Sequence, residues 1–345
     1  MYLITCAYWL NAYVFEAPEA DIWLGLGQIK SLFDSRWVVS NNQKFTKMNP
    51  NSVAEPKQIL TNGERFGVVG GGNMTKALVF PLIEKGLLSP EQIVVSATTQ
   101  ATLASWRELG CATTTDNKLV TSTSDIVLWG VKPQMLSKAI PQSWNLTEER
   151  YSKCSSLHIS VLAGITLETF KQRLQDKLEV LPRAPYKLRC IRTMPNIGAS
   201  VGSGCVVFTP EPEVIDEDRQ FMHDFFGPTG LYFEVPEYQM NAYSGLMGCG
   251  IGFMFPVIEG LSDGAVKMGI PRAASLKLAA QVMKGAGELL LAENRHPGEL
   301  KDRVCSPGGS TICGVAALEE NGVRNAFIKA VEASTKRGEE LGQLK

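Results

Sequence analysis

The chain has 345 residues, of which 44% are hydrophobic and 20% are charged, and its formal net charge is −1. This length suits two domains better than one core, and the absence of a basic surplus predicts no nucleic-acid partner. Eight cysteines lack C-x-x-C spacing and three histidines lack ligand spacing. These patterns predict reduced thiols in an intracellular protein and no metal site.

The first 64 residues match no structural pattern clearly. Residues 1–15 are rich in apolar side chains, but they lack the basic start of a secretory signal and are too short to span a bilayer. We therefore expect no membrane partner. Residues 40–64 are typical of a polar, flexible linker. We expect residues 1–64 to form a poorly ordered extension or a partner-binding tail. Because its acidic and basic residues nearly balance, a cytoplasmic location is favoured over a mitochondrial one.

A glycine-rich turn follows this extension. Residues 65–69 form a short apolar run, Gly70, Gly71 and Gly72 come next, and a helix-like run covers residues 74–86. Strand, glycine turn and helix open a Rossmann unit, in which a dinucleotide pyrophosphate rests on the helix N-terminus. The usual third small residue of this fingerprint is replaced by Thr75, whose bulk is expected to loosen the packing of helix against strand.

The second predicted strand bears on cofactor choice. An NAD-selective site would place a carboxylate at the end of this strand, 93–96, to hold the ribose hydroxyl. The chain has Ser96 there, followed by Ala97, Thr98 and Thr99. Hydroxyl groups can donate to a 2′-phosphate, so the sequence favours NADPH, or use of both cofactors, over strict use of NADH.

Further strands alternate with helical stretches. The buried-strand pattern recurs at 124–131, 158–164 and 190–196. Alternation of this kind predicts an α/β fold with a doubly wound, mainly parallel sheet. We place this dinucleotide-binding Rossmann domain at residues 65–236.

From about Tyr238 the apolar spacing becomes helical. Apolar residues recur at steps of three and four between positions 276 and 290, and again between 323 and 341. We therefore predict an all-α domain over residues 237–345. Its apolar stripes are expected to form its core or a subunit interface.

A loop near the C-terminus reads S-P-G-G-S-T and covers residues 306–311. Gly308 and Gly309 allow a sharp turn, and Ser310 and Thr311 stand at a predicted helix start. Free N–H groups and hydroxyls there favour a small carboxylate. The simpler alternative is an ordinary glycine-rich turn with a capped helix.

Four runs together resemble the pyrroline-5-carboxylate reductase family. They are F-G-V-V-G-G-G-N-M at 66–74, D-G-A-V-K-M-G-I-P at 263–271, the run from His296 to Glu319, and A-V-E-A-S at 330–334. The resemblance extends over about residues 65–342. It implies reduction of the C=N bond of 1-pyrroline-5-carboxylate with NADPH or NADH, the last step of proline synthesis. It also implies a homodimer or a larger homo-oligomer, in which the helical domain interlocks with its twin.

The resemblance also implies roles for individual residues. Thr311 would face the ring nitrogen as the catalytic residue. The substrate carboxylate would be bound by Ser306, Gly308, Gly309 and Ser310, and Glu293 would be a nearby acid. The cofactor would be contacted by a larger set: Val69, Gly70, Gly71, Gly72, Asn73, Met74, Ser96, Asn117, Val131, Lys132, Pro133, Ala163 and Asn196.

Two segments depart from the family pattern. The family usually shows S-G-S-G-P-A where this chain has Met247, Cys249 and Ile251, and M-P-N-T-P where this chain ends in Ile197 and Gly198. Each lost hydroxyl removes a hydrogen bond worth about 1 kcal/mol. Two alternatives therefore stay open: a reductase of a different cyclic imine, or a non-catalytic dinucleotide-binding paralogue. The β-hydroxyacid dehydrogenases share the expected fold, but they do not explain the S-P-G-G-S-T loop.

Overall fold

The computed structural model describes residues 58–140, 155–177, 187–343 of the chain. Most of the predicted N-terminal extension lies outside these residues. Its last seven residues do not, and they correct the expected linker boundary. Leu60 is only 3% exposed and belongs to the main hydrophobic cluster, and the Ile59 N–H donates to the Leu87 carbonyl at 2.9 Å. Residues 58–64 are therefore part of the folded unit.

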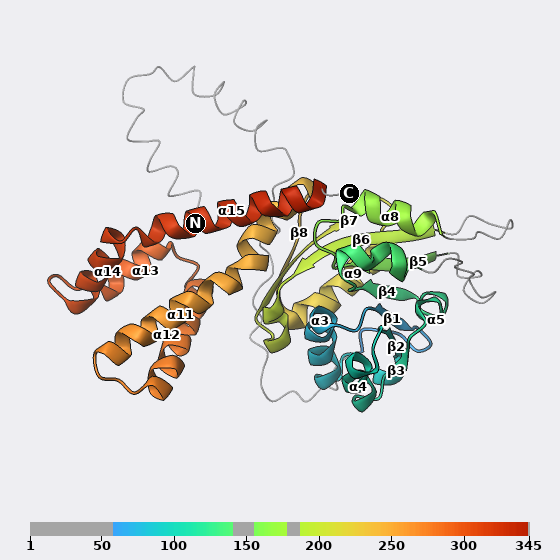
Figure 1. Cartoon of the computed structure of the whole chain (residues 1–345), viewed down its shortest axis with the longest axis horizontal. Helices are drawn as coiled ribbons and strands as arrows, with labels where there is room; N and C mark the ends of the chain where they lie inside the picture. The colour runs from blue at the N-terminus through green and yellow to red at the C-terminus, as the bar shows by residue number, and fades with distance from the viewer. Residues whose placement is uncertain (1–57, 141–154, 178–186, 344–345) are drawn as a thin grey trace, which may run out of the picture. The chain divides into compact units, whose positions relative to one another are not determined.

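The centre of this unit is an eight-stranded sheet with the order β3-β2-β1-β4-β5-β6-β7-β8 (Figure 1). Its strands are β1 (Phe66–Val69), β2 (Ile93–Ser96), β3 (Ala112–Thr114), β4 (Ile126–Trp129), β5 (Ser155–Ser160), β6 (Lys187–Pro195), β7 (Gly204–Pro210) and β8 (Gly230–Glu234). All neighbouring strands are parallel except β6 and β7. The predicted mainly parallel sheet is thus confirmed.

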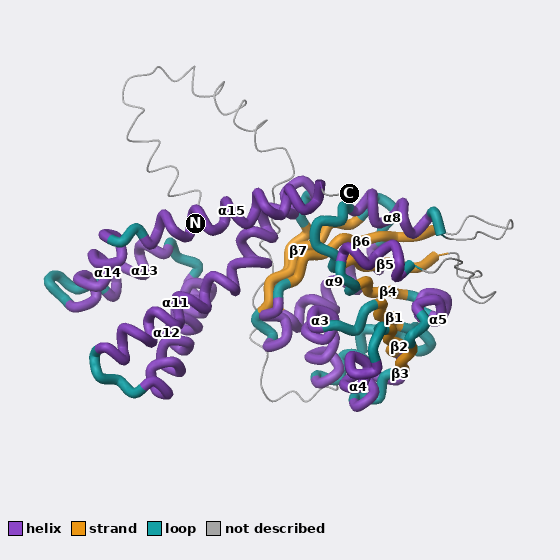
Figure 2. Tube along the Cα trace, in the orientation of Figure 1, coloured by secondary structure: helices purple, strands orange, loops and turns teal. Residues whose placement is uncertain are grey.

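Helices cover both faces of the sheet, as Figure 2 shows. They are α3 (Asn73–Glu84), α4 (Gln100–Glu108), α5 (Asn117–Thr123), α6 (Leu136–Ala139), α8 (Leu167–Gln175) and α9 (Asp216–Phe226). Phe66 and Val68 of β1 pack in one hydrophobic cluster, and Val69 packs in the other. Because both faces are buried, the central strands are continuous apolar runs rather than alternating ones.

Three strands were not predicted from the sequence. Strand β3 is only three residues long and partly exposed, and so carries little hydrophobic signal. Strands β7 and β8 extend the sheet beyond β6 through the antiparallel pairing of β6 and β7. A short 3-10 helix, η3 (Ile197–Val201), lies in the β6–β7 connection, which turns at Gly202 with a φ of +70°.

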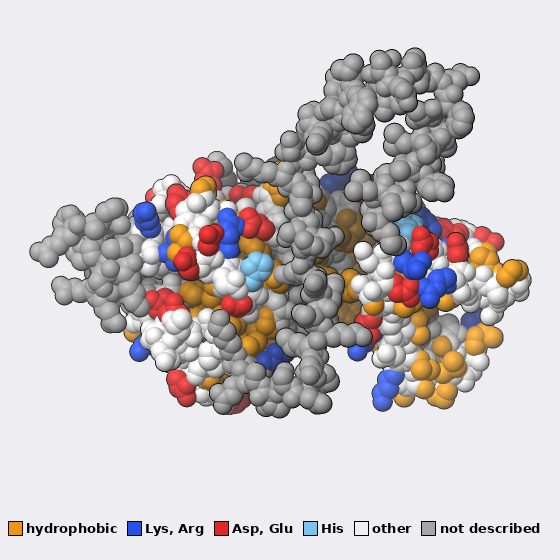
Figure 3. Space-filling view, turned by 180° about the vertical axis from the view of Figure 1, so that it is seen from behind, with side chains coloured by type: hydrophobic (Ala, Val, Ile, Leu, Met, Phe, Trp, Pro, Cys, Tyr) orange, Lys and Arg blue, Asp and Glu red, His pale blue; other side chains and the backbone are white. Residues whose placement is uncertain are grey.

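The C-terminal part is entirely helical, as predicted. It contains α10 (Met240–Tyr243), a π-helical turn η6 (Ser244–Gly248), α11 (Cys249–Lys267), α12 (Arg272–Glu293), α13 (Pro297–Val304), α14 (Ser310–Glu320) and α15 (Val323–Gln343). In α11–α14 only Ser262, Ser275 and Ala279 are buried. Large apolar side chains stay exposed, such as Phe255 at 62% and Val282 at 64%, and they gather over this part in Figure 3.

One helical stretch of the described residues, Glu237–Lys267, is long and apolar enough to cross a membrane, with a mean hydropathy of 1.4. A helix that is covered by another subunit has the same composition. Polar residues interrupt the stretch at Glu259, Asp263 and Lys267.

The burial of Cys111 predicts that its thiol reacts slowly. The six described cysteines are free, and burial raises the pKa of the Cys111 thiol to about 11. At pH 8 only about one part in a thousand of such a thiol is thiolate, the reactive form. We expect iodoacetamide to label Cys111 at least tenfold more slowly in the native protein than in urea, as measured by peptide mass spectrometry. Equal rates in the two states would contradict this burial.

Candidate functional site

The glycine turn between β1 and α3 is shaped by a lack of space. Gly70 has a φ of +99°, and a Cβ there would lie 2.7 Å from the Val131 backbone nitrogen. A Cβ on Gly71 would lie 2.7 Å from Nε1 of Trp106, whereas one on Gly72 would meet nothing within 4 Å. The first two glycines are therefore required by the fold, and the third leaves the backbone open to a ligand.

The turn presents an anion-binding face. Gly70 N–H and Gly71 N–H both donate to the Ser96 carbonyl at 3.0 Å, and no side chain caps α3 at Gly72. Within the described structure, no hydrogen bond is formed by the N–H groups at residues 73–75, the first turn of α3. Unpaired N–H groups at the positive end of a helix dipole suit a phosphate.

Thr75 corrects the expectation of loose packing. Its side chain is fully buried, and its hydroxyl lies 2.9 Å from the Gly70 carbonyl and 3.0 Å from the Gly72 carbonyl. Space for its methyl group comes from Gly130, where a Cβ would collide with it. The residue therefore packs tightly and also bonds to the turn.

The structure corrects the expectation that the Ser96 hydroxyl, at the end of β2, can bind a 2′-phosphate. The Ser96 side chain is fully buried, and its hydroxyl points to the Val68 carbonyl at 3.4 Å. This hydroxyl cannot reach a 2′-phosphate; Ser96 supports the turn through its backbone carbonyl instead. Thr98 and Thr99 are exposed just beyond β2. The Thr99 hydroxyl caps α4 by accepting from Thr102 N–H at 3.3 Å, so Thr98 is the better candidate for the hydroxyl that the 2′-phosphate hypothesis requires.

Asn117 and Asn196 both use their side chains within the protein. The Asn117 amide donates to the Ala139 carbonyl at 2.7 Å. The Asn196 amide donates to the Met247 carbonyl at 2.9 Å, while its oxygen accepts from Gly198 N–H at 3.2 Å and from Cys205 N–H at 3.1 Å. Asn196 thus joins the end of β6 to the π-helical turn. Its side chain is therefore used by the fold, and contact of residue 196 with a cofactor stays a prediction.

The two departures from the family pattern meet in space. A Cβ on Gly198 would lie 3.1 Å from Cδ1 of Ile251. The Ser203 carbonyl oxygen is closer still, at 2.7 Å from that Cβ, so the backbone itself leaves no room for a side chain at 198. The two departures therefore lie side by side.

The remaining predicted cofactor residues lie at the carboxyl ends of strands. Val131, Lys132 and Pro133 follow β4, and Ala163 follows β5; Ala163 and Lys132 are exposed. The order of strands reverses between β1 and β4, and open α/β sheets bind ligands at such a switch point. The glycine turn and residue 131 face each other there.

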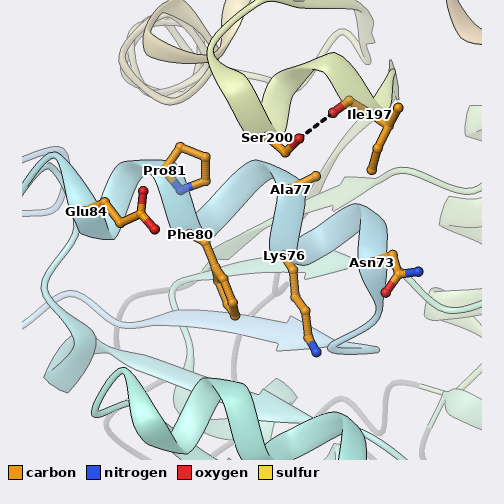
Figure 4. A pocket seen from close by; sticks show the side chains of 8 residues that line it. All are labelled: Asn73, Lys76, Ala77, Phe80, Pro81, Glu84, Ile197 and Ser200. Atoms are coloured by element: carbon orange, nitrogen blue, oxygen red, sulfur yellow. Dashed lines mark hydrogen bonds between the residues drawn. The ribbon is translucent and has the colours of Figure 1, made fainter. Parts of the chain in front are cut away.

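A groove lies beside the same turn, between α3 and η3 (Figure 4). Its volume is about 310 Å³. Its lining combines charged, polar and apolar side chains from the two elements: Asn73, Lys76, Ala77, Phe80, Pro81, Glu84, Ile197 and Ser200. Asn73 connects this groove to the first turn of α3, where the predicted phosphate site lies.

The C-terminal loop is a tight turn that ends at a helix start, as predicted. Gly309 N–H donates to the Ser306 carbonyl at 3.0 Å, and Gly308 has a φ of +68°, as the third residue of a type II turn requires. Helix α14 then begins at Ser310 with no side-chain cap at Gly309. Ser310 and Thr311 are exposed. A second helix N-terminus is thus open to an anion.

Glu293 is bound by arginines. It forms an ion pair with Arg303, in the last turn of α13, and another at 3.3 Å with Arg295, in the loop between α12 and α13. The fold thus supplies two cationic partners for this carboxylate, and a role of Glu293 in substrate binding stays a prediction. Among the described residues, no hydrogen bond or ion pair joins the turn at 306–311 to the glycine turn.

A substitution at Gly70 tests the turn. The Ala variant would need a φ of +99° and would press its Cβ against the backbone of residue 131. We expect Gly70→Ala to weaken NADPH binding at least tenfold, as measured by calorimetry on the purified protein. Gly72→Ala, at an open position with ordinary φ, is the matched control for the fold, with a circular dichroism spectrum like that of the wild type. Unchanged affinity in Gly70→Ala would contradict the geometry.

No group of three or more histidine, cysteine or acidic residues that could hold a metal occurs in the described ranges.

Two parts of the chain match known protein families. Residues 237–341 match the family description "Pyrroline-5-carboxylate reductase dimerisation", and residues 65–164 match "NADP oxidoreductase coenzyme F420-dependent".

Individual relatives agree with this. Pyrroline-5-carboxylate reductase of Methanosarcina acetivorans is 38% identical over 281 residues, covering 81% of this chain and 98% of the relative. Pyrroline-5-carboxylate reductase 3 of Xenopus laevis is 33% identical over 279 residues, covering 80% and 96%. The structure of the Coxiella burnetii pyrroline-5-carboxylate reductase aligns with a TM-score of 0.68 at 28% identity and covers 81% of this chain and 99% of that one. The chain therefore belongs to the pyrroline-5-carboxylate reductase family.

Proposed function

We propose that this protein reduces the C=N bond of 1-pyrroline-5-carboxylate to give L-proline, with NADPH as the preferred hydride donor and NADH as the alternative. The observation that carries the proposal is the pair of uncapped helix N-termini. One, at α3, suits a pyrophosphate, and the other, at α14, suits a carboxylate. The two family matches, to residues 65–164 and 237–341, include both helix starts.

The nicotinamide, when bound, supplies the hydride. The residues of this chain would bind the cofactor and the substrate and orient them toward each other. The N–H groups at the start of α3 would hold the pyrophosphate, and the ends of β4 and β5 would line the nicotinamide half. A structure of the Plasmodium falciparum pyrroline carboxylate reductase contains NADP, and its fold matches with a TM-score of 0.68.

At the other end of the substrate, Ser306 and the backbone N–H groups of Gly309 and Ser310 would take the carboxylate. The exposed Thr311 hydroxyl, one residue further along the first turn of α14, would face the ring nitrogen. The hydroxyl would donate a hydrogen bond to the nitrogen, which gains negative charge as the hydride adds to the ring carbon. Water would then supply the proton to the nitrogen, so no strong acid is required.

The complete site requires a second copy of the chain. Helices α11–α14 bury almost nothing by themselves, and the matched family description is one of dimerisation. We propose a homodimer, or a larger assembly of dimers, whose helical parts interlock and bring a turn at 306–311 to a glycine turn. A cytoplasmic location and the absence of nucleic-acid and membrane partners stay predictions.

The decisive experiment is an assay of purified protein with pyrroline-5-carboxylate and each reduced nicotinamide in turn. We expect oxidation of NADPH that depends on the imine, with proline formed in equal amount. Cofactor binding without turnover on any cyclic imine would establish the non-catalytic alternative. Turnover on a larger or smaller ring only would point to a pocket reshaped by Met247 and Ile251.

A further inference from the structure

The carbonyl groups of the glycine turn all point at hydrogen-bond donors of the protein. The Gly70 carbonyl accepts from Gly72 N–H at 2.9 Å, and the Gly72 carbonyl accepts from Lys76 N–H at 3.0 Å. The Thr75 hydroxyl lies within hydrogen-bonding distance of both. The Gly71 carbonyl, between them, accepts from the indole N–H of Trp106 at 3.0 Å. Each carbonyl is thereby directed into the protein.

The orientation of these carbonyls matters for an anion. A peptide group that turns its oxygen inward presents its N–H end outward, and only the N–H end attracts a phosphate. A turn without side-chain donors could rotate a peptide and place an oxygen beside the pyrophosphate, because glycine tolerates many backbone conformations. Two side chains limit that freedom here, and one of them is 35 residues away in the sequence.

The packing around Trp106 fixes its indole ring in place beside the glycine turn. Trp106 is fully buried on α4, and Phe80 of α3 meets its ring edge-on, with centroids 4.8 Å apart. Phe80 also lines the groove of Figure 4, so the aromatic contact extends from the surface of α3 to the turn. The indole lies so close to Gly71 that no Cβ fits between them. The ring therefore fixes both the position of the peptide and the direction of its oxygen.

We propose that Trp106 and Thr75 are positioning residues for the dinucleotide: their donors hold the glycine-turn carbonyls away from the pyrophosphate and so keep its N–H groups directed outward. This inference rests on the proposed function only in that the turn binds a dinucleotide. Neither side chain needs to touch the cofactor. Their effect is on cofactor affinity and not on the chemistry of the imine.

The test uses the full-length protein and two variants, each of which removes one donor. Trp106→Phe removes the indole N–H, and Thr75→Val removes the hydroxyl. We expect each to raise the Kd for NADPH by roughly fivefold, the equivalent of one net hydrogen bond, and the pair together to raise it by more than either. The KM for NADPH should rise in parallel, while kcat at saturating cofactor changes less than twofold.

Trp129→Phe is the matched control. Trp129 is equally buried and donates its indole N–H to Nδ1 of His158 at 3.0 Å, on the other face of the sheet. We expect it to lower the melting temperature without changing the Kd for NADPH. Hydrogen exchange supplies a second readout: the peptide containing residues 66–78 should exchange faster in Trp106→Phe, and NADPH should restore part of its protection.

The outcomes are distinct. If wild-type protein binds no dinucleotide, the proposed function itself fails. If wild-type protein binds NADPH and Trp106→Phe and Thr75→Val bind it equally well, the positioning role is wrong and the proposed function is untouched. If Trp129→Phe weakens binding as much as Trp106→Phe, the effect is general destabilisation and the inference is also overturned.

Discussion

Replacing Leu278 and Val282 together by glutamate should abolish both the dimer and the activity. The two side chains lie one turn apart on α12 and are 56% and 64% exposed in the single chain. If a second copy covers them, two buried carboxylates would cost several kcal/mol each. We expect a monomer by light scattering and at least a thousandfold loss of reductase activity, because the site is incomplete without the partner.

The matched control is Leu119→Glu. Leu119 is 46% exposed on α5, outside the helical part, so this variant places a charge on an exposed leucine that no partner is expected to cover. It should keep the wild-type mass and activity. A Leu278→Glu, Val282→Glu protein that remains an active dimer would show that this face of α12 is not the interface. Loss of the folded state altogether, seen by circular dichroism, would agree with a chain whose helical part cannot bury its apolar surface alone.

Removing the Thr311 hydroxyl is expected to have the next largest effect. As hydride adds to the neutral imine, negative charge develops on the ring nitrogen, so the hydrogen bond that the Thr311 hydroxyl donates to it becomes stronger. Such a bond contributes about 1.5–3 kcal/mol when one partner is charged. Thr311→Ala should therefore lower kcat roughly 10–100-fold. The Kd for NADPH should not change, because the cofactor is held at the glycine turn.

Thr311→Ser distinguishes the role of the Thr311 hydroxyl from that of its methyl group. It keeps the hydroxyl and removes only a methyl group from an exposed position in the first turn of α14. We expect it to retain most of the wild-type kcat in steady-state assays with pyrroline-5-carboxylate. If Thr311→Ala turns over as fast as wild type, the role proposed for this hydroxyl is wrong, and the backbone N–H groups of α14 would be sufficient.

The departures from the family pattern mean less than their chemistry alone suggests. Gly198 and Ile251 are far apart in sequence, yet they lie side by side in the structure, where the Ser203 carbonyl oxygen leaves no room for a side chain at 198. The Asn196 amide still connects β6 to the π-helical turn through the Met247 carbonyl, a bond that does not depend on the side chain at 247. Replaced side chains in this region therefore leave the backbone connection in place.

The sequence was sufficient where the signal is local. Apolar runs gave the central strands, glycines at 70 and 308 marked turns with positive φ, and Ser310 marked the start of α14. The same signal failed at β3 and β8, which are edge strands that bury little, and at β7, an interior strand whose Val206 and Val207 are buried. It also failed at residues 58–64, where polar composition concealed the buried Leu60.

Side-chain direction and long-range pairing were determined only by the tertiary structure. Ser96 appeared available because its strand end is polar, but the pleat of β2 turns its hydroxyl into the sheet. Nothing in the sequence indicated that the last turn of α13 returns Arg303 to Glu293. Trp106 gave no sign of a role because its partner, Gly71, is 35 residues away. Local sequence determines which backbone shapes are possible; packing between distant segments decides which polar groups remain free to bind a ligand.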